Sequence, residues 1–250
     1  MLLDERRAFI EKKLLAEGKI RVSELAELFE VSGETIRKDL LYLEEKGVAK
    51  KGYGGAVVAG ELLEPSFVEK HKKNISQKND IAKRALEFVS DGMIVFLDAG
   101  STVFTFSKML PIKNNLTVFT NSLGAAQALD DFQIQTHILG GKIRHNSNAI
   151  VGGWATRLIR EIQADIAFLG TSGFSARGGP CVENFEESEI KKAMIDNANK
   201  VVILGDSSKA NTHSMIEFAR WQDVDALITD GGMDEGLLQS IREQTEVITV

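Results

Sequence analysis

Residues 23–43 have the sequence SELAELFEVSGETIRKDLLYL, and this stretch decides the N-terminal fold. Ser23 is a suitable N-cap for one short helix, and Ser32 is a suitable N-cap for a second helix over residues 33–46. Val31 and Ser32 predict a tight turn between them. Two short helices joined in this way have the dimensions of a helix-turn-helix.

The second helix of this pair has an apolar side and a polar, basic side. Ile36, Leu40 and Leu43 recur at helical spacing, so we expect them to pack against their own domain. A helix that enters the DNA major groove also needs a polar front that meets bases and phosphates. The alternative is a small helical bundle with solvated charges, which periodicity alone does not exclude. The candidate DNA-binding residues on this front are Ser32, Glu34, Thr35, Arg37 and Lys38.

The flanking segments complete a domain over residues 1–57. A further helix is expected over residues 4–16, before Gly18, and residues 48–57 predict a short strand and a glycine-rich turn. Such a hairpin would form a wing beside the helix-turn-helix. Its candidate contacts to phosphate or the minor groove are Lys50, Lys51 and Tyr53.

The charge of the chain is unevenly distributed. The 250 residues carry a formal net charge of −6, which by itself argues against binding to DNA. Residues 1–53, however, hold 11 Lys and Arg against 11 Asp and Glu, so all of the excess acid lies further along the chain. A neutral N-terminal segment can bind DNA if its cations gather on one face. The single cysteine, Cys181, excludes an internal disulfide. We expect no signal peptide, no membrane span and a cytoplasmic protein.

The remainder predicts a partly helical linker over residues 58–76 and an α/β domain over residues 77–250. Short apolar runs alternate there with helical segments, which is typical of a mainly parallel sheet covered on both faces. Strands are expected at residues 93–97, 116–119, 138–139, 166–169, 201–204, 226–229 and 247–250. Helices are expected at residues 81–89, 103–109, 123–129, 155–162, 187–199 and 237–243.

Polar loops follow five of these strands in succession. Ligands of open parallel sheets bind outside the carboxyl ends of the strands, where these loops meet. A single loop of this kind is explained equally well as a plain turn, but five together suit a pocket for a small phosphorylated polyol. Glu187 and Lys191 lie four residues apart on a predicted helix, and that spacing alone favours a surface ion pair. The loop residues singled out are Asp98, Gly100, Ser101, Thr102, Thr120, Asn121, Gly141, Arg144, Gly170, Asp206 and Lys209.

The N-terminal segment resembles the DNA-binding domain of the DeoR family of bacterial regulators. The motifs run in order across nearly all of residues 1–57, so they are more specific than any one helix-turn-helix pattern. Lys38 stands where the family more often has a second arginine, which favours a phosphate contact over base recognition. The matching motifs are ERR at 5–7, VSELA at 22–26, FEVS at 29–32, TIRKDL at 35–40, LE at 43–44 and GGA at 54–56.

The resemblance continues into the sensor domain of that family, which is similar in fold to ribose-5-phosphate isomerase and coenzyme A transferases. It implies a phosphorylated sugar or related metabolite as effector. Residues 178–184 depart from the family pattern, and if this loop lines the pocket, Cys181 and Glu183 would alter sugar specificity. Carried over by motif, the effector site comprises Asp98, Gly100, Ser101, Thr102, Thr120, Asn121, Gly141, Arg144, Gly170, Glu187, Lys191, Asp206 and Lys209.

The resulting hypothesis is a repressor of a carbohydrate-metabolism operon. Its expected partners are a double-stranded DNA operator, a phosphorylated sugar and further copies of the chain in a dimer or tetramer, because palindromic operators demand paired readers. No cofactor and no metal are expected, since the four histidines lack ligand spacing. Trp154 and Trp221 are expected in the core or an interface. The alternative is a sugar-phosphate isomerase with an accessory DNA-binding domain, in which Asp98, Glu187, Asp206 and Lys209 would do acid–base chemistry.

Overall fold

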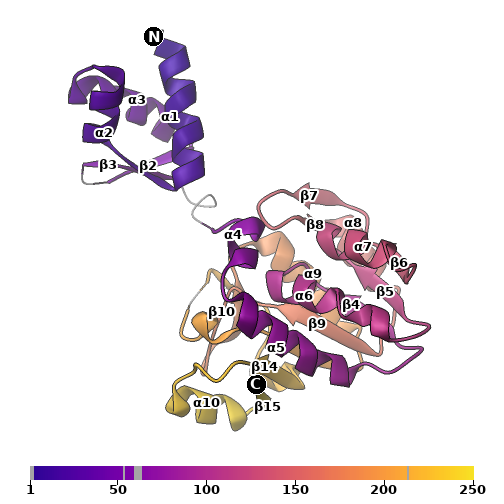
Figure 1. Ribbon diagram of the computed structural model, residues 1–250. Helices are drawn as coiled ribbons and strands as arrows, with labels where there is room; N and C mark the ends of the chain where they lie inside the picture. The colour runs from indigo at the N-terminus through magenta and orange to yellow at the C-terminus, as the bar shows by residue number, and fades with distance from the viewer. Residues whose placement is uncertain (1–2, 53, 59–63, 213) are drawn as a thin grey trace. The chain divides into compact units, whose positions relative to one another are not determined.

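The chain folds into two compact units, residues 1–65 and 66–250. The computed structural model describes residues 3–52, 54–58, 64–212 and 214–250, and Figure 1 shows the elements of each unit. Among the helices in these described residues, none combines the length and the apolar character needed to cross a membrane.

The first unit is a winged helix-turn-helix, as predicted. Three helices pack against an antiparallel sheet with the strand order β1-β3-β2 in its described residues. Strand β1 was not expected: it pairs along its whole length with β3, with Ile20 opposite Ala56. The elements are α1 (Leu3–Glu17), β1 (Lys19–Arg21), α2 (Val22–Phe29), α3 (Gly33–Glu45), β2 (Ala49–Gly52) and β3 (Gly55–Val58).

One of the two predicted helix caps is confirmed and the other is wrong. Ser32 caps α3, and its Oγ accepts a hydrogen bond of 3.1 Å from the amide of Thr35. Helix α2, in contrast, begins at Val22 with Arg21 at the N-cap, so Ser23 lies inside the first turn. The reason is that Arg21 ends β1, opposite Gly55, and the sheet already holds it in the extended conformation that an N-cap needs.

The second unit is built on a seven-stranded parallel sheet with the order β15-β14-β12-β9-β4-β5-β6. Every predicted strand of the α/β domain is present, which confirms the mainly parallel, Rossmann-like fold class. The strands are β4 (Ile94–Leu97), β5 (Thr117–Thr120), β6 (Gln135–Ile138), β9 (Ile166–Gly170), β12 (Val201–Leu204), β14 (Ala226–Thr229) and β15 (Glu246–Thr249).

Helices cover both faces of this sheet, because successive side chains of a strand point to opposite faces. Val95 and Leu97 of β4 pack into one apolar cluster with residues of α5 and α6, while Phe96 packs into the other with residues of α8, α9 and α10. In Figure 1, α5 and α6 lie in front of β4 and β9. The helices are α4 (Phe67–Lys72), α5 (Ile75–Ala85), α6 (Ser101–Ser107), α7 (Leu123–Asp130), α8 (Gly153–Ile159), α9 (Phe185–Asp196) and α10 (Glu235–Arg242), with short 3₁₀ turns η2 (Leu86–Phe88), η3 (Leu110–Ile112), η4 (Ser207–Lys209) and η5 (Trp221–Asp223).

Two small antiparallel sheets and one early helix start were not expected. Residues 178–184 were described as a loop, but most of them form a strand in the sheet β10-β11-β13. Helix α4 and the start of α5 fall within the predicted linker and belong to the second unit. The additional strands are β7 (Lys142–Arg144), β8 (Ala149–Val151), β10 (Gly173–Ser175), β11 (Gly179–Val182) and β13 (Ile216–Glu217).

Candidate DNA-binding face and effector site

Helix α3 has the orientation that the spacing predicts. Ile36, Leu40 and Leu43 are buried in the core of the first unit. Arg37 and Lys38 are exposed, and 60% of the Arg37 side chain is accessible. Arg37 lies 3.3 Å from the exposed carboxylate of Glu34 on the preceding turn, a pair weak enough to open when a phosphate approaches. The arrangement presents two cations outward on a helix that is fixed from behind.

Two of the predicted DNA contacts have a structural task at the start of this helix. The hydroxyls of Ser32 and Thr35 lie 2.9 Å apart, and Ser32 also caps the backbone. A side chain that caps its own helix is held in one position, so it can meet DNA only in that position. Ser32 and Glu34 are exposed, and Thr35 is half-buried.

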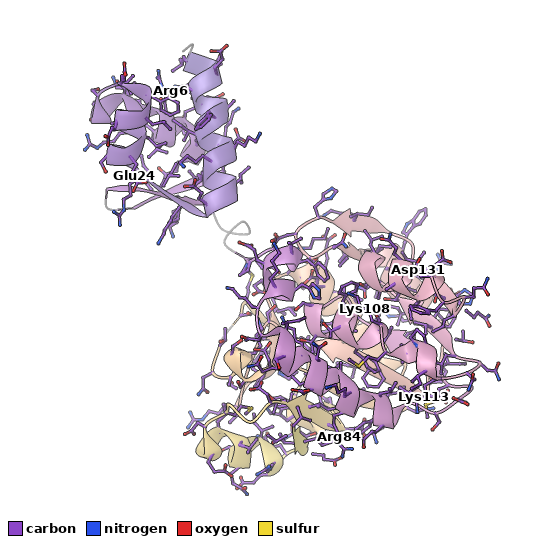
Figure 2. All side chains as sticks on the ribbon, in the orientation of Figure 1. Arg6, Glu24, Arg84, Lys108, Lys113 and Asp131 are labelled. Carbon is purple, nitrogen blue, oxygen red and sulfur yellow. The ribbon has the colours of Figure 1, made fainter. Side chains whose placement is uncertain are left out.

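A buried ion-pair cluster joins α1 to α3, and sequence reasoning did not assign it a role. Asp39 is almost inaccessible, and it accepts hydrogen bonds from Nε of Arg6 at 2.7 Å and from Nε of Arg7 at 3.0 Å. Arg6, labelled in Figure 2, lies between the two helices. The Arg7 guanidinium also stacks 4.0 Å from the ring centre of Tyr42. These contacts set the angle at which α3 is held.

The wing presents two of its three predicted residues to solvent. Lys50 and Lys51 are exposed on β2. The amide of Lys51 donates a 2.9 Å hydrogen bond to the Glu44 carboxylate, which ties the wing to the end of α3. Tyr53 lies outside the described residues.

In the second unit, a buried ion pair joins the ends of β4 and β9 to α9. The Asp98 carboxylate accepts the amide of Gly170 at 3.0 Å and pairs with Nζ of Lys191. The same ammonium donates to the Gly170 carbonyl at 2.9 Å. Only 3% of the Lys191 side chain is accessible. Because β4 and β9 are neighbours, the absence of a side chain at Gly100 lets its loop approach the backbone of Gly170 closely.

A second ion pair extends this cluster along α9. Arg144 of β7 donates a 3.2 Å hydrogen bond to the carboxylate of Glu187, and both side chains are nearly buried. The surface ion pair between Glu187 and Lys191 favoured from spacing alone is therefore wrong, because both residues face inward and bind partners on other elements. One turn of α9 therefore places both charges at the carboxyl edge of the parallel sheet.

Polar groups from β5 and its loop lie beside these pairs. The Thr120 hydroxyl donates to the Leu97 carbonyl at 2.7 Å, and the Asn121 amide donates to the Ile150 carbonyl at 3.2 Å. Asn121 is 1% exposed, and its Oδ1 is one of the buried side-chain atoms that lack a hydrogen-bond partner among the described residues. A buried carbonyl oxygen without a partner is costly, so it can accept a hydrogen bond from a bound hydroxyl. Nearby, a side chain at Gly141 would collide with the Val151 carbonyl.

The fifth strand end gathers cations that sequence reasoning missed in part. Asp206 is buried and accepts hydrogen bonds from Asn74 at 2.8 Å and from Ser208. Burial lowers the pKa of Lys209, and the Asp206 carboxylate opposes that shift. Burial likewise lowers the pKa of Lys78 to about 8. Lys78 donates to the backbone carbonyls of Lys70 and Lys73 and is electrostatically coupled to Asp206 and Lys209.

Lys78 was visible in the sequence as an anomaly. It occupies the same buried side of α5 as Ile81, Ala82 and Ala85, at helical spacing from them. A lysine on an apolar helix face is rarely buried without a partner. The predicted linker over residues 58–76 ends just before Lys78 and the predicted helix begins at residue 81, so the predicted elements do not place Lys78 on this helix face.

The remaining predicted positions differ in role: some contact the proposed site, and others only hold the backbone. Ser101 and Thr102 form the start of α6 beside Gly100. Glu183 lies 3.9 Å from Nζ of Lys70 and is electrostatically coupled to Lys209, so it belongs to the cationic cluster. Cys181 is buried on β11, where its thiol donates to the Gly173 carbonyl and burial raises its pKa. Cys181 is thus held by backbone, while Glu183 faces the site. Within the described residues, no cluster of potential metal ligands occurs.

This combination defines a class of protein: a DNA-binding regulator with a separate ligand-sensing domain. The chain matches the family models of the DeoR-like helix-turn-helix domain over residues 6–61 and of the DeoR C-terminal sensor domain over residues 73–231. The chain belongs to the DeoR family of transcriptional regulators.

Relatives that align over nearly their whole length are named as repressors. The chain is 31% identical to a putative aga operon transcriptional repressor from Escherichia coli, over 98% of this chain and 93% of the relative. It is 33% identical to the lactose phosphotransferase system repressor of Streptococcus mutans, over 99% and 100% of the two chains. It is 28% identical to the glycerol-3-phosphate regulon repressor of Shigella flexneri, over 91% and 90%. Each of these relatives is named as a regulator and not as an enzyme.

Among solved structures, ribose 5-phosphate isomerase A from Methanocaldococcus jannaschii superposes with a TM-score of 0.42 at 23% identity, over 55% of each chain.

Proposed function

We propose that this protein represses a carbohydrate-metabolism operon and that a phosphorylated sugar releases it from its operator DNA. The relatives support this proposal, because they are named as repressors of the aga operon, the lactose phosphotransferase system and the glycerol-3-phosphate regulon. In this assignment residues 1–57 bind DNA, residues 77–250 sense the effector and residues 58–76 join them.

The observation that carries the proposal is the different placement of cations in the two units. Arg37 and Lys38 are exposed on a helix of the size that enters a major groove. Lys78 is withdrawn from water and Lys209 is half-buried, and both are coupled to Asp206 at the carboxyl edge of a parallel sheet. Desolvated cations with a few convergent polar groups suit a small anionic ligand. Burial has already removed water from these cations, so they can form strong charge-assisted hydrogen bonds to the anion.

In the proposed effector site, the lysine cluster binds the phosphate of the effector and the neighbouring strand ends bind its hydroxyls. Lys209 and Lys78 meet the phosphate, while Asn121 and Arg144 lie on the neighbouring elements that would meet sugar oxygens. The effector acts by binding more tightly to the conformation that fits DNA poorly, so that its binding shifts the population away from the operator-bound form.

The proposal is tested with a salt-controlled gel-shift assay on the DNA upstream of the gene, in the presence and absence of sugar phosphates chosen by thermal-shift screening. Arg37→Ala should weaken specific DNA binding and leave sugar-phosphate binding unchanged. Lys209→Ala should do the reverse and give a repressor that remains on DNA when the sugar phosphate is added. Lys113→Ala, at a partly exposed lysine of the second unit, is the control. Release of Lys209→Ala by the same sugar phosphate at the same concentration would show that the pocket is misplaced.

A further inference from the structure

Helix α8 and the start of α9 expose large apolar side chains on one face of the second unit. The Trp154 side chain is 81% exposed, Phe185 is 64% exposed, and Leu158 lies on the same outer side of α8 as Trp154. The other tryptophan, Trp221, is 1% exposed in the core. Burial of a large aromatic side chain is strongly favourable because it removes a large apolar area from water. A tryptophan exposed to this extent therefore indicates a binding surface. Of the two roles expected for Trp154, only the interface role remains.

Two hollows flank α8 and meet at its start. One is a groove of about 330 Å³ between α8 and α9, and the other is a hollow of about 480 Å³ between α8 and the strands β7 and β8. Both are lined by Gly152 and Gly153, and Trp154 stands at the rim of the larger one. At Gly140 and Gly153 no atom lies within 4 Å of the position that a Cβ would occupy. The larger hollow is therefore floored by bare backbone and open to a ring from another molecule.

The charges on this face are of both signs. Arg157 is exposed on α8 and Arg160 at its C-cap, while Glu186 and Glu189 line the same groove from α9. Lys142 holds Glu186 in place at 2.9 Å. A nucleic acid or an anionic membrane would select a face of cations alone. A face on which cations and carboxylates lie side by side can pair with the same face of a second copy. In a two-fold interface, the cations of each copy then meet the carboxylates of the other.

We propose that this face, comprising α8, the start of α9 and the β7–β8 hairpin, is where two copies of the chain associate. The Trp154 ring of one copy occupies the glycine-floored hollow of the other, and the arginines of α8 meet the glutamates of the partner's α9. The proposal rests on the proposed function, since two copies place two helix-turn-helix units on one palindromic operator. Helix α9 and β7 also carry Glu187 and Arg144, so this face and the proposed effector site share two elements.

The test follows assembly and Trp154 together in the full-length protein. Sedimentation equilibrium measures the oligomeric state, and acrylamide quenching of tryptophan fluorescence is recorded over the same range of concentration. Trp221 is buried, so quenching in the wild-type protein reports Trp154. We expect association with a several-fold fall in quenching as the dimer forms. A chain that stays monomeric at micromolar concentrations, or an oligomer whose tryptophan remains fully quenchable, overturns the proposal.

Substitutions locate the contact. Trp154→Ser should weaken association at least thirtyfold, which is the size of a central interface contact (about 2 kcal/mol). Ile112→Ser, at an apolar residue elsewhere in the same unit that is 71% exposed, should change it less than twofold. Arg160→Glu should weaken association and reduce its dependence on salt. Circular dichroism confirms that each variant is folded. Unchanged association of Trp154→Ser overturns the proposal.

Gel-shift assays separate this inference from the proposed function. Wild-type protein that associates through Trp154 but binds no operator supports the interface and refutes the repressor. Wild-type protein that binds a two-half-site operator while Trp154 stays quenchable refutes the interface alone. If both hold, Trp154→Ser should lose the advantage of two half-sites over one half-site and keep its affinity for a single half-site.

Discussion

The two units use their cations in opposite ways. The first unit leaves Arg37, Lys38, Lys50 and Lys51 exposed, whereas the second withdraws Lys78 and Lys191 almost completely from water. An exposed cation attracts a polyanion over distances of about a Debye length and is screened by salt. A buried cation is costly without a partner, but it discriminates strongly among small ligands and conformations. Under the proposed function, this difference explains how one acidic chain would bind DNA at one end and an anionic metabolite at the other.

The largest expected effect concerns the buried pair of Asp98 and Lys191. Lys191→Met should lower the free energy of unfolding of the second unit by about 3–5 kcal/mol, because it leaves the Asp98 carboxylate buried without its counter-charge. Denaturant unfolding followed by fluorescence of the buried Trp221 measures that unit specifically. Lys192→Met, at a partly exposed neighbour on the same helix, is the control and should cost less than about 1 kcal/mol. A similar cost for both variants would break the comparison.

The next effect concerns Asp39, which is buried although the other charges compared in the first unit are exposed. Asp39→Ala should destabilise the first unit by about 2–3 kcal/mol, less than Lys191→Met, because Arg6 and Arg7 keep some contact with water. Amide hydrogen exchange in α3 measures this loss, with Glu45→Ala on the exposed side of the helix as control. Operator affinity should fall with it, since α3 is no longer held at its angle. Unchanged exchange would mean that the apolar contacts of α3 suffice.

The architecture of both units could be predicted because it depends on local patterns. The central strands β4, β9, β12 and β14 are buried along nearly their whole length, so each appears as a continuous apolar run. The apolar spacing of Ile36, Leu40 and Leu43 likewise determines which side of α3 faces out. In contrast, β1 and most strands of the small sheets have only two or three residues each, too few for any pattern to emerge.

The site could be predicted only as a set of positions. Motif order placed Asp98 and Lys191 in one pocket, but they lie 93 positions apart and no spacing rule pairs them. The four-residue spacing of Glu187 and Lys191 was misleading, because burial against the sheet directs each toward a different strand end. Asn74 was missed because its partner, Asp206, lies 132 positions away and is brought near only by the tertiary fold. The carbonyl partners of Lys78 are local, at Lys70 and Lys73, and Lys78 was missed because it lies just after the predicted linker.

The third prediction concerns pH. The pKa of Lys78 is about 8 in the folded protein, below its ordinary value of 10.5, so the unfolded chain retains this proton at higher pH than the folded protein does. Stability should therefore rise as pH increases from about 8 toward 10.5, and this rise should be absent in Lys78→Met. Phosphate binding should weaken over the same range by up to about tenfold per pH unit, as the ammonium charge is lost.

Calorimetric titration with inorganic phosphate and with the sugar phosphate checks this prediction. Lys83→Met, at an exposed lysine on the same helix, should follow the wild-type profile. If Lys78→Met keeps the wild-type pH dependence, the buried cation does not contribute to the effector site.

The smallest effect sharpens the comparison from the exposed side. Lys51→Ala should weaken DNA binding by about 1 kcal/mol or less and to the same extent on every sequence, because an exposed lysine on the wing acts on phosphate charge alone. The slope of log affinity against log salt should fall by about 1, the signature of one lost phosphate contact. Arg37→Ala, in contrast, should weaken binding to the operator more than to random DNA. If Lys51→Ala instead changed sequence preference and left the salt slope unchanged, the wing would recognise bases, and exposure alone would not distinguish a cation that attracts DNA from one that reads it.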